Sequence, residues 1–155
     1  ELGSETLTSD TINGITIDHS AVKFNQAIIY STQDRNTKPP TITVSGDSTS
    51  IAYRKSDNGG AEGTDVNVDE FRLADGTGNN AGFSINHVFN ISGEEKLGIS
   101  SYVNANAVGA GNPPARSVRV WKDDTSAQFT TMRFRMTDGA SLTYAGTNFT
   151  LLGTD

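Results

Sequence analysis

The chain has 155 residues, no cysteine and a formal net charge of −6. Its length fits one domain with a core of its own, and the lack of cysteine excludes a disulfide framework, a thiolate nucleophile and a zinc site with cysteine ligands. The acidic balance argues against a nucleic-acid partner, since phosphate binding needs a basic patch, and no apolar run approaches the roughly 20 residues of a membrane-spanning helix. We therefore expect neither nucleic acid nor membrane as a partner.

Residues 1–10 are polar apart from two leucines. We expect an N-terminal arm there, ordered only where it docks on a neighbouring subunit, followed by a single domain over residues 11–155. Strand-forming residues begin at Ile12 and recur to Tyr30. Residues 33–40 contain two prolines in a polar cluster, which predicts a loop because proline cannot continue a hydrogen-bonded ladder.

The middle of the chain alternates short strands with turns. Residues 41–44 and 50–55 predict a hairpin, and a glycine-rich tip at 56–63 leads into further strands over 66–73 with a bend at Asp69 and Glu70. Apolar and polar residues alternate cleanly over 83–91, which is typical of a half-buried strand, and a turn at 93–95 returns the chain through 97–103. The small-residue loop at 104–114 is long enough to suggest a functional or interface role.

Four strand-forming runs close the chain, at residues 117–121, 127–136, 141–144 and 148–152. Short polar linkers separate them, so we expect a closing meander. Within the longest run Met132, Phe134 and Met136 share one face, while Arg133 and Arg135 share the other. Helical periodicity is absent. The pattern predicts an all-β fold, an antiparallel, jelly-roll-like β-sandwich of about ten strands.

One loop carries the oxygen ligands that a calcium site would need. Asp57, Asn58, Glu62 and Asp65 lie in its glycine-rich sequence. Their spacing matches no known calcium loop, so a solvated acidic loop is the favoured interpretation and a metal site the weaker one. We expect no cofactor.

Catalysis has little support in the sequence. Three pairs of neighbouring carboxylates occur, at 69 and 70, 94 and 95, and 123 and 124, but adjacent strand residues point to opposite faces and form no ready dyad. A serine triad would need His19 or His87, yet no G-x-S-x-G elbow is present. His87 lies on the apolar phase of its strand, which favours a core or interface histidine. We therefore expect a protein that is not an enzyme.

Several large side chains are candidates for an interface or a ligand site. Trp121 and Tyr102 could stack on sugar rings or lie at a subunit contact. Arg119, Arg133 and Arg135 are expected on exposed strand faces, where they could pair across a subunit boundary or form an ordinary wet face.

The C-terminal region resembles a known family. The residues that carry this are PPAR at 113–116, Trp121, TSAQFT at 125–130 and AGTNFTLLGTD at 145–155. They resemble the close of a β-sandwich domain common in virion proteins of tailed bacteriophages, including decoration, head-fibre and tail-appendage proteins. The resemblance implies a fold and a location in the virion, and the family's motif contains no catalytic residues.

The resemblance implies a non-enzymatic viral structural protein on the virion surface, or otherwise extracellular. It would decorate or stabilise the capsid, or form part of a tail appendage, through contacts with itself and with other virion proteins such as the major capsid protein. A homo-oligomer is expected, with a trimer favoured by analogy alone. The alternative is a carbohydrate-binding adhesion domain that recognises host-surface glycans.

Overall fold

The structure, a computed structural model, describes residues 1–32, 40–44, 51–74, 81–105, 111, 113–136 and 143–155. These residues form antiparallel β-strands and no helix, so the all-β prediction is confirmed. The strands are β1 (Gly3–Thr6), β2 (Ile15–Asp18), β3 (Phe24–Ser31), β4 (Pro40–Val44), β5 (Ile51–Asp57), β6 (Gly63–Val68), β7 (Phe71–Arg72), β8 (Gly82–Phe89), β9 (Lys96–Asn104), β10 (Ala115–Asp123), β11 (Thr131–Met136) and β12 (Asn148–Thr154). No described segment is a helix able to span a membrane.

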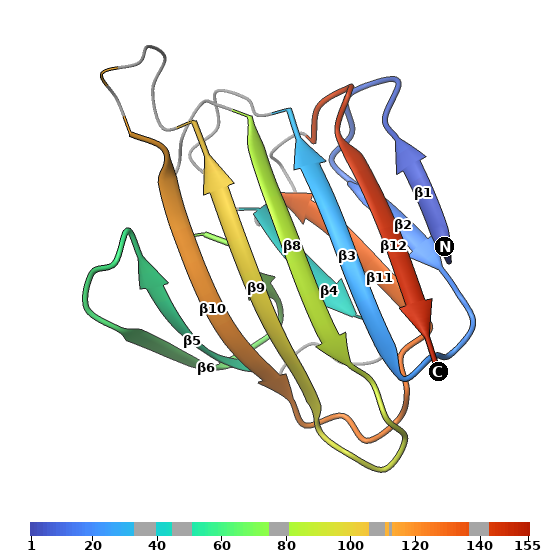
Figure 1. The fold of residues 1–155 in the computed structure, drawn as a ribbon. Coiled ribbons are helices and arrows are strands. Elements are labelled where there is room, and N and C mark those ends of the chain that lie inside the picture. The colour runs from blue at the N-terminus through green and yellow to red at the C-terminus, as the bar shows by residue number, and fades with distance from the viewer. Residues whose placement is uncertain (33–39, 45–50, 75–80, 106–110, 112, 137–142) are drawn as a thin grey trace.

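Two sheets of unequal size pack against each other as a β-sandwich (Figure 1). The large sheet has eight strands in the order β1-β12-β3-β8-β9-β10-β5-β6, and the small sheet has four in the order β2-β11-β4-β7. The five long strands from β12 to β10 form the front layer of Figure 1, with β2, β11 and β4 behind them. The small sheet therefore covers one face of the large sheet.

The core lies between the two sheets. On β11 the side chains of Met132, Phe134 and Met136 are buried, as their spacing predicted, while Arg133 and Arg135 lie on the opposite face of that strand. Isoleucines of β2 and β4, the flanking strands, extend the same buried layer. The small sheet thus follows the usual rule for an antiparallel sheet with one covered and one open face.

The N-terminal segment is ordered by its own chain. Strand β1 pairs with β12, and the Leu2 amide donates a 2.8 Å hydrogen bond to the Leu151 carbonyl. Leu2 and Leu7 pack against the core. The expectation that this segment needs a neighbouring subunit to become ordered was therefore wrong.

Strand pairing differs from the sequence prediction in two places. Strands β4 and β5 were expected to form a hairpin, but β4 pairs with β11 and β7, whereas β5 pairs with β10 and β6. The expected closing meander is also wrong, because β10 and β12 belong to the large sheet and β11 to the small one. A polar linker fixes where a chain turns, but it does not fix which sheet the next strand joins.

Other predictions were sounder. The hairpin of β8 and β9 and the bend between β6 and β7 are confirmed. The loops expected at 33–40 and 104–114 lie largely outside the described residues. Of the run at 141–144, Thr143 forms a single bridge with Thr11.

Candidate functional site

The central strands of the large sheet turn their polar side chains inward and their apolar side chains outward. On β8, Ser84 and Asn86 are buried against the small sheet, whereas Phe83 and His87 are exposed on the outside. The predicted alternation is confirmed, but its apolar side chains face outward and not into the core. The same inversion holds on β9, where Ser100 is buried and Ile99 is exposed.

Aromatic rings inside the sandwich explain the inversion. Trp121 and Tyr102 point inward and lie opposite small residues on neighbouring strands, Gly98 and Ser84 respectively. A Cβ on Gly98 would overlap the Trp121 indole. The rings fill the space between the sheets, so the inner positions opposite them must be small, and the larger aliphatic residues occupy the outer face.

The outward side chains form a continuous surface, which we call the outer apolar face. The strand register aligns them in four rows from β3 to β10. The rows are Phe24–Phe89–Leu97–Lys122, Gln26–His87–Ile99–Val120, Ile28–Ile85–Ser101–Val118 and Tyr30–Phe83–Val103–Arg116. Ten large apolar side chains are exposed in the described residues, and eight of them belong to this face, each 40–55% exposed. The other two, Ile12 and Val66, lie elsewhere.

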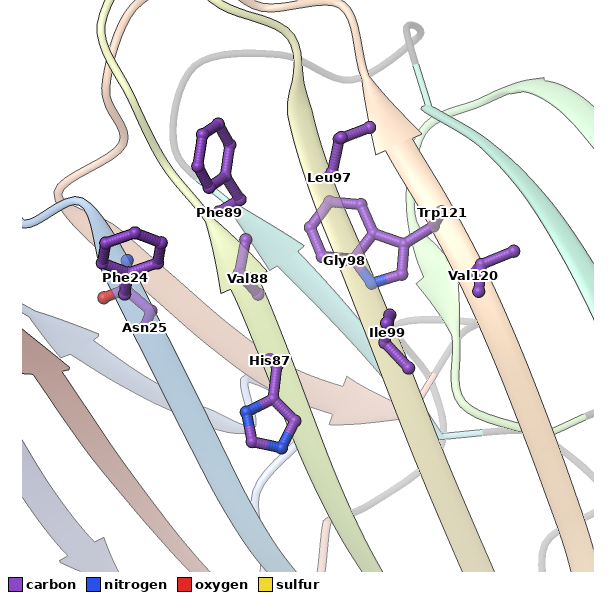
Figure 2. Close-up of a pocket in the computed structure, with 10 residues that line it drawn as sticks. All are labelled: Phe24, Asn25, His87, Val88, Phe89, Leu97, Gly98, Ile99, Val120 and Trp121. Carbon is purple, nitrogen blue, oxygen red and sulfur yellow. The ribbon is translucent and has the colours of Figure 1, made fainter.

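A shallow hollow of about 460 Å³ lies within this face (Figure 2). The hollow lies over the backbone of Gly98 between the outward side chains of Leu97 and Ile99, and the Trp121 indole lies on the inner side of that strand (Figure 2). Phe24 and Phe89 stand on the other side of the hollow, with ring centroids 5.6 Å apart. The lining is mostly apolar, which suits a hydrophobic side chain better than a polar ligand.

Charged groups stand at the edges of the outer apolar face. Lys122 and Arg116 end the first and last rows, and Lys122 forms an ion pair of 2.9 Å with Glu95. The two middle rows contain no lysine, arginine, aspartate or glutamate. His87 is their only titratable side chain, and its ring lies 3.5 Å from the Gln26 amide. The centre of the face is therefore neutral and largely apolar.

Arg119 was expected on an exposed face but is only 1% exposed. Its guanidinium lies 5.3 Å from the centre of the Tyr53 ring, donates to the Ser117 hydroxyl at 3.0 Å and stands 3.6 Å from an Asp57 carboxylate oxygen. The prediction for Arg119 assumed that Val118 and Val120 on either side of it point into the core. In this sheet both valines face outward. Arg119 is thus held within the sandwich and is not part of the surface.

Trp121 and Tyr102 are also buried, at 5% and 3% exposure. The indole packs on Phe71 of the small sheet, with ring centroids 5.2 Å apart, and burial raises the pKa of the Tyr102 hydroxyl. A ring must present an open face to stack on a sugar. In this structure neither ring does.

Arg133 and Arg135 lie on the outer side of the small sheet, where they were expected. Arg133 Nε donates to the Asn13 carbonyl at 2.7 Å, and Arg135 Nη2 donates to a Glu70 carboxylate oxygen at 3.3 Å. Burial raises the pKa of Glu70, and the charge of Arg135 partly opposes that rise. Both arginines thus have partners within the chain.

The four candidate calcium ligands do not converge on one point. Asp57, Glu62 and Asp65 each form an ion pair with a different cation, at 3.6, 2.8 and 3.0 Å, and the Asn58 side-chain oxygen accepts the Arg116 amide at 2.8 Å. Across the described residues, no group of three acidic or histidine side chains could hold a metal ion. The loop is an ordered hairpin tip, with positive φ at Asn58 and at the glycine that follows, as primed turns require.

Buried polar groups join the loops at one end of the sandwich. The Lys96 ammonium donates to the carbonyls of Ile91, Glu94 and Ser126 at 2.6, 2.6 and 3.1 Å. The Asn90 amide donates to the carbonyls of Val22 and Phe129 at 3.0 Å each. These contacts satisfy backbone groups between strands, so the two residues serve the fold.

The sequence contained a signal for the outer apolar face that our interpretation missed. In β9 and β10, Leu97, Ile99, Val118 and Val120 alternate with glycine, serine, arginine and tryptophan. Strand β10 thus carries large residues on both phases, which is typical of a sheet covered on both sides. We had assigned one phase to the core and the other to solvent.

Comparison with models of known protein families gives no match to this chain, and a search of curated proteins finds no similar sequence.

Proposed function

We propose that this chain is a non-enzymatic structural protein that works by packing its outer apolar face against another protein surface in a larger assembly. The assembly we propose is the particle of a tailed bacteriophage, in which the chain decorates or stabilises the capsid surface or forms part of a tail appendage. The phage setting rests on the resemblance of residues 113–155 to virion domains. The mode of action rests on the outer apolar face.

One observation carries the proposal. A sheet face that meets only water normally bears the polar residues, yet here the water-exposed face of four central strands bears the apolar ones. Covering such a face is a strong driving force for association, because the transfer of apolar area out of water is favourable. A subunit of a shell or appendage has that cover supplied by its neighbours.

The arrangement of charged groups agrees with a structural role. The candidate acids Asp57, Glu62 and Asp65 are held in ion pairs, and Glu70 is bound to Arg135. Each of these four carboxylates is thus held beside a cation of the same chain.

A second candidate function has one observation in its favour. A hollow of about 260 Å³ at one end of the sandwich has a mainly apolar lining that also includes the polar side chains of Asp57, Asn58, Asn104 and Arg116. Amides and a carboxylate are suitable partners for sugar hydroxyls, which keeps a glycan-binding adhesion domain as the alternative.

Mass spectrometry of purified particles would test the proposed function. Particles from a culture that carries the gene would be banded in a density gradient, and the band would be searched for peptides of this chain. We expect the chain in the particle band at a fixed ratio to the main shell protein. Its absence from the band, together with glycan-array binding that is lost on Asn104→Ala, would favour the adhesion domain instead.

A further inference from the structure

We infer that the outer apolar face is covered by a second copy of this chain, so that the large sheets of two subunits pack face to face. The inference rests on the proposed function and names the partner of the same surface. The partner we infer is a second copy of the chain, and not a different virion protein or a small ligand.

The size of the face fits a protein interface. Three of the eight side chains are aromatic and would each present about 150–250 Å² when fully open, and the five aliphatic ones would present less, so at roughly half exposure the eight together present on the order of 500–800 Å². A standard interface buries about 800 Å² on each partner, whereas the largest apolar patch on a typical monomer is about 300–600 Å². The face therefore lies at or above the upper end of the range for a monomer patch and approaches the area of one side of a stable dimer contact.

The distribution of charge favours a copy of the same chain. When a surface meets itself across a two-fold axis, any central charge meets its own kind, so a self-associating face must be neutral at its centre. The two middle rows meet this condition, and the cations Lys122 and Arg116 stand at the ends of the outer rows. A partner recognised by charge would instead require charged groups among the central side chains.

The shape of the face also suits packing of one sheet on another. Its rows run across four neighbouring antiparallel strands, and two such sheets pack about 10 Å apart with their side chains interleaved. The hollow above Gly98 offers space for a large side chain of the facing copy. The same geometry already exists on the inner side, where the small sheet covers the large one.

Charge substitution within the face tests the inference. Ile99→Glu places a carboxylate in a middle row, and Val118→Glu does so on the next strand, where its cross-strand neighbours are Ser101 and Ser56. Each appears in both subunits of the contact, so we expect either change to weaken self-association at least about 100-fold, because an unpaired charge would be buried twice. Sedimentation equilibrium over about 1 to 100 µM measures the association constant.

The chain supplies matched controls. Val66→Glu and Ile12→Glu replace exposed apolar residues outside the face and should leave association unchanged. Trp121, the single tryptophan, lies inside the sandwich, so its fluorescence reports whether each variant has kept the fold. Oligomers that survive both face substitutions in folded variants would overturn the inference.

A second measurement needs no substitution. Hydroxyl-radical labelling of the unaltered protein should fall at Phe83, Leu97 and Ile99 as the concentration rises, while labelling of Val66 and Ile12 stays constant. Labelling that does not depend on concentration, in a protein that remains monomeric, would refute a homotypic contact. If the chain is nevertheless found in purified particles, the proposed structural function stands and another protein covers the face.

Discussion

Replacing Gly98 by alanine should displace the tryptophan at the centre of the sandwich. The new methyl group would overlap the Trp121 indole, which already packs on Phe71 at 5.2 Å between ring centroids. Phe71 is itself held edge-on by Tyr53 at 5.5 Å, so the indole cannot move straight back into the small sheet. It must tilt sideways, and its neighbours must follow.

The expected loss in the free energy of unfolding follows from adding a small volume where the core is already filled. Adding one methyl group to a well-packed core costs about 1–3 kcal/mol. For a chain of this length, that corresponds to a fall in Tm of roughly 2–12 °C. Urea unfolding measures the free energy, and the emission of the single tryptophan measures the displacement in the folded state.

Two further variants isolate the cause. Ser101→Ala adds no atom and lies on the outward phase of the same strand, so it should change unfolding by less than about 0.5 kcal/mol. In a Trp121→Leu background the overlap is gone, so Gly98→Ala should then cost little, which a double-mutant cycle detects as coupling. If Gly98→Ala leaves both stability and emission unchanged in the parent protein, the reasoning about the glycine is refuted.

Three further changes test the buried polar groups. Lys96→Met should lower the free energy of unfolding, measured in urea, by about 2–4 kcal/mol, because three carbonyls lose their hydrogen-bond donor. A decrease below about 1 kcal/mol would mean that water replaces the ammonium. Asn90→Ala should lower the free energy of unfolding by a similar amount, since this one side chain joins the segments that lead into β3 and β11, and Asn90→Asp should not restore stability because it lacks the amide donor. Glu70→Gln should stabilise the protein by up to about 1 kcal/mol near pH 7 and by much less near pH 4. Burial raises the pKa of Glu70, so its contribution to stability is present below the pKa of the unfolded chain and is lost as pH rises through the folded pKa. A Glu70→Gln advantage that grows on acidification would contradict this sign.

Local strand content was predictable, because alternation leaves a direct mark in the sequence. The spacing of Met132, Phe134 and Met136 identified a covered face in the small sheet, where one side is core and the other solvent. The same reasoning failed for β8 and β9, where small and polar residues face the core and most of the large apolar residues face outward. There the choice depends on Trp121 lying over Gly98, a contact between strands that no periodicity along one strand reveals.

Strand order was less predictable than strand position. The sequence placed β4 and β5 well but paired them with each other, since turn residues between them looked like a hairpin. Their true partners, β11 and β10, follow much later in the chain. The site predictions failed for a related reason: Arg119 and Trp121 have ordinary surface-like surroundings in sequence, and only the packing of the two sheets shows that they are enclosed.

The order of strands also determines when this protein can fold during synthesis. Strand β1 has only β12 as a sheet neighbour, and β2 has only β11. The first two strands therefore cannot pair within a sheet before the last two have been synthesised. Pairings between such distant segments form slowly, because a long loop must close first. A nascent chain that has not yet delivered β11 and β12 from the ribosome can complete neither sheet. A competent subunit can therefore exist only after β11 and β12 have emerged, however early the other strands do.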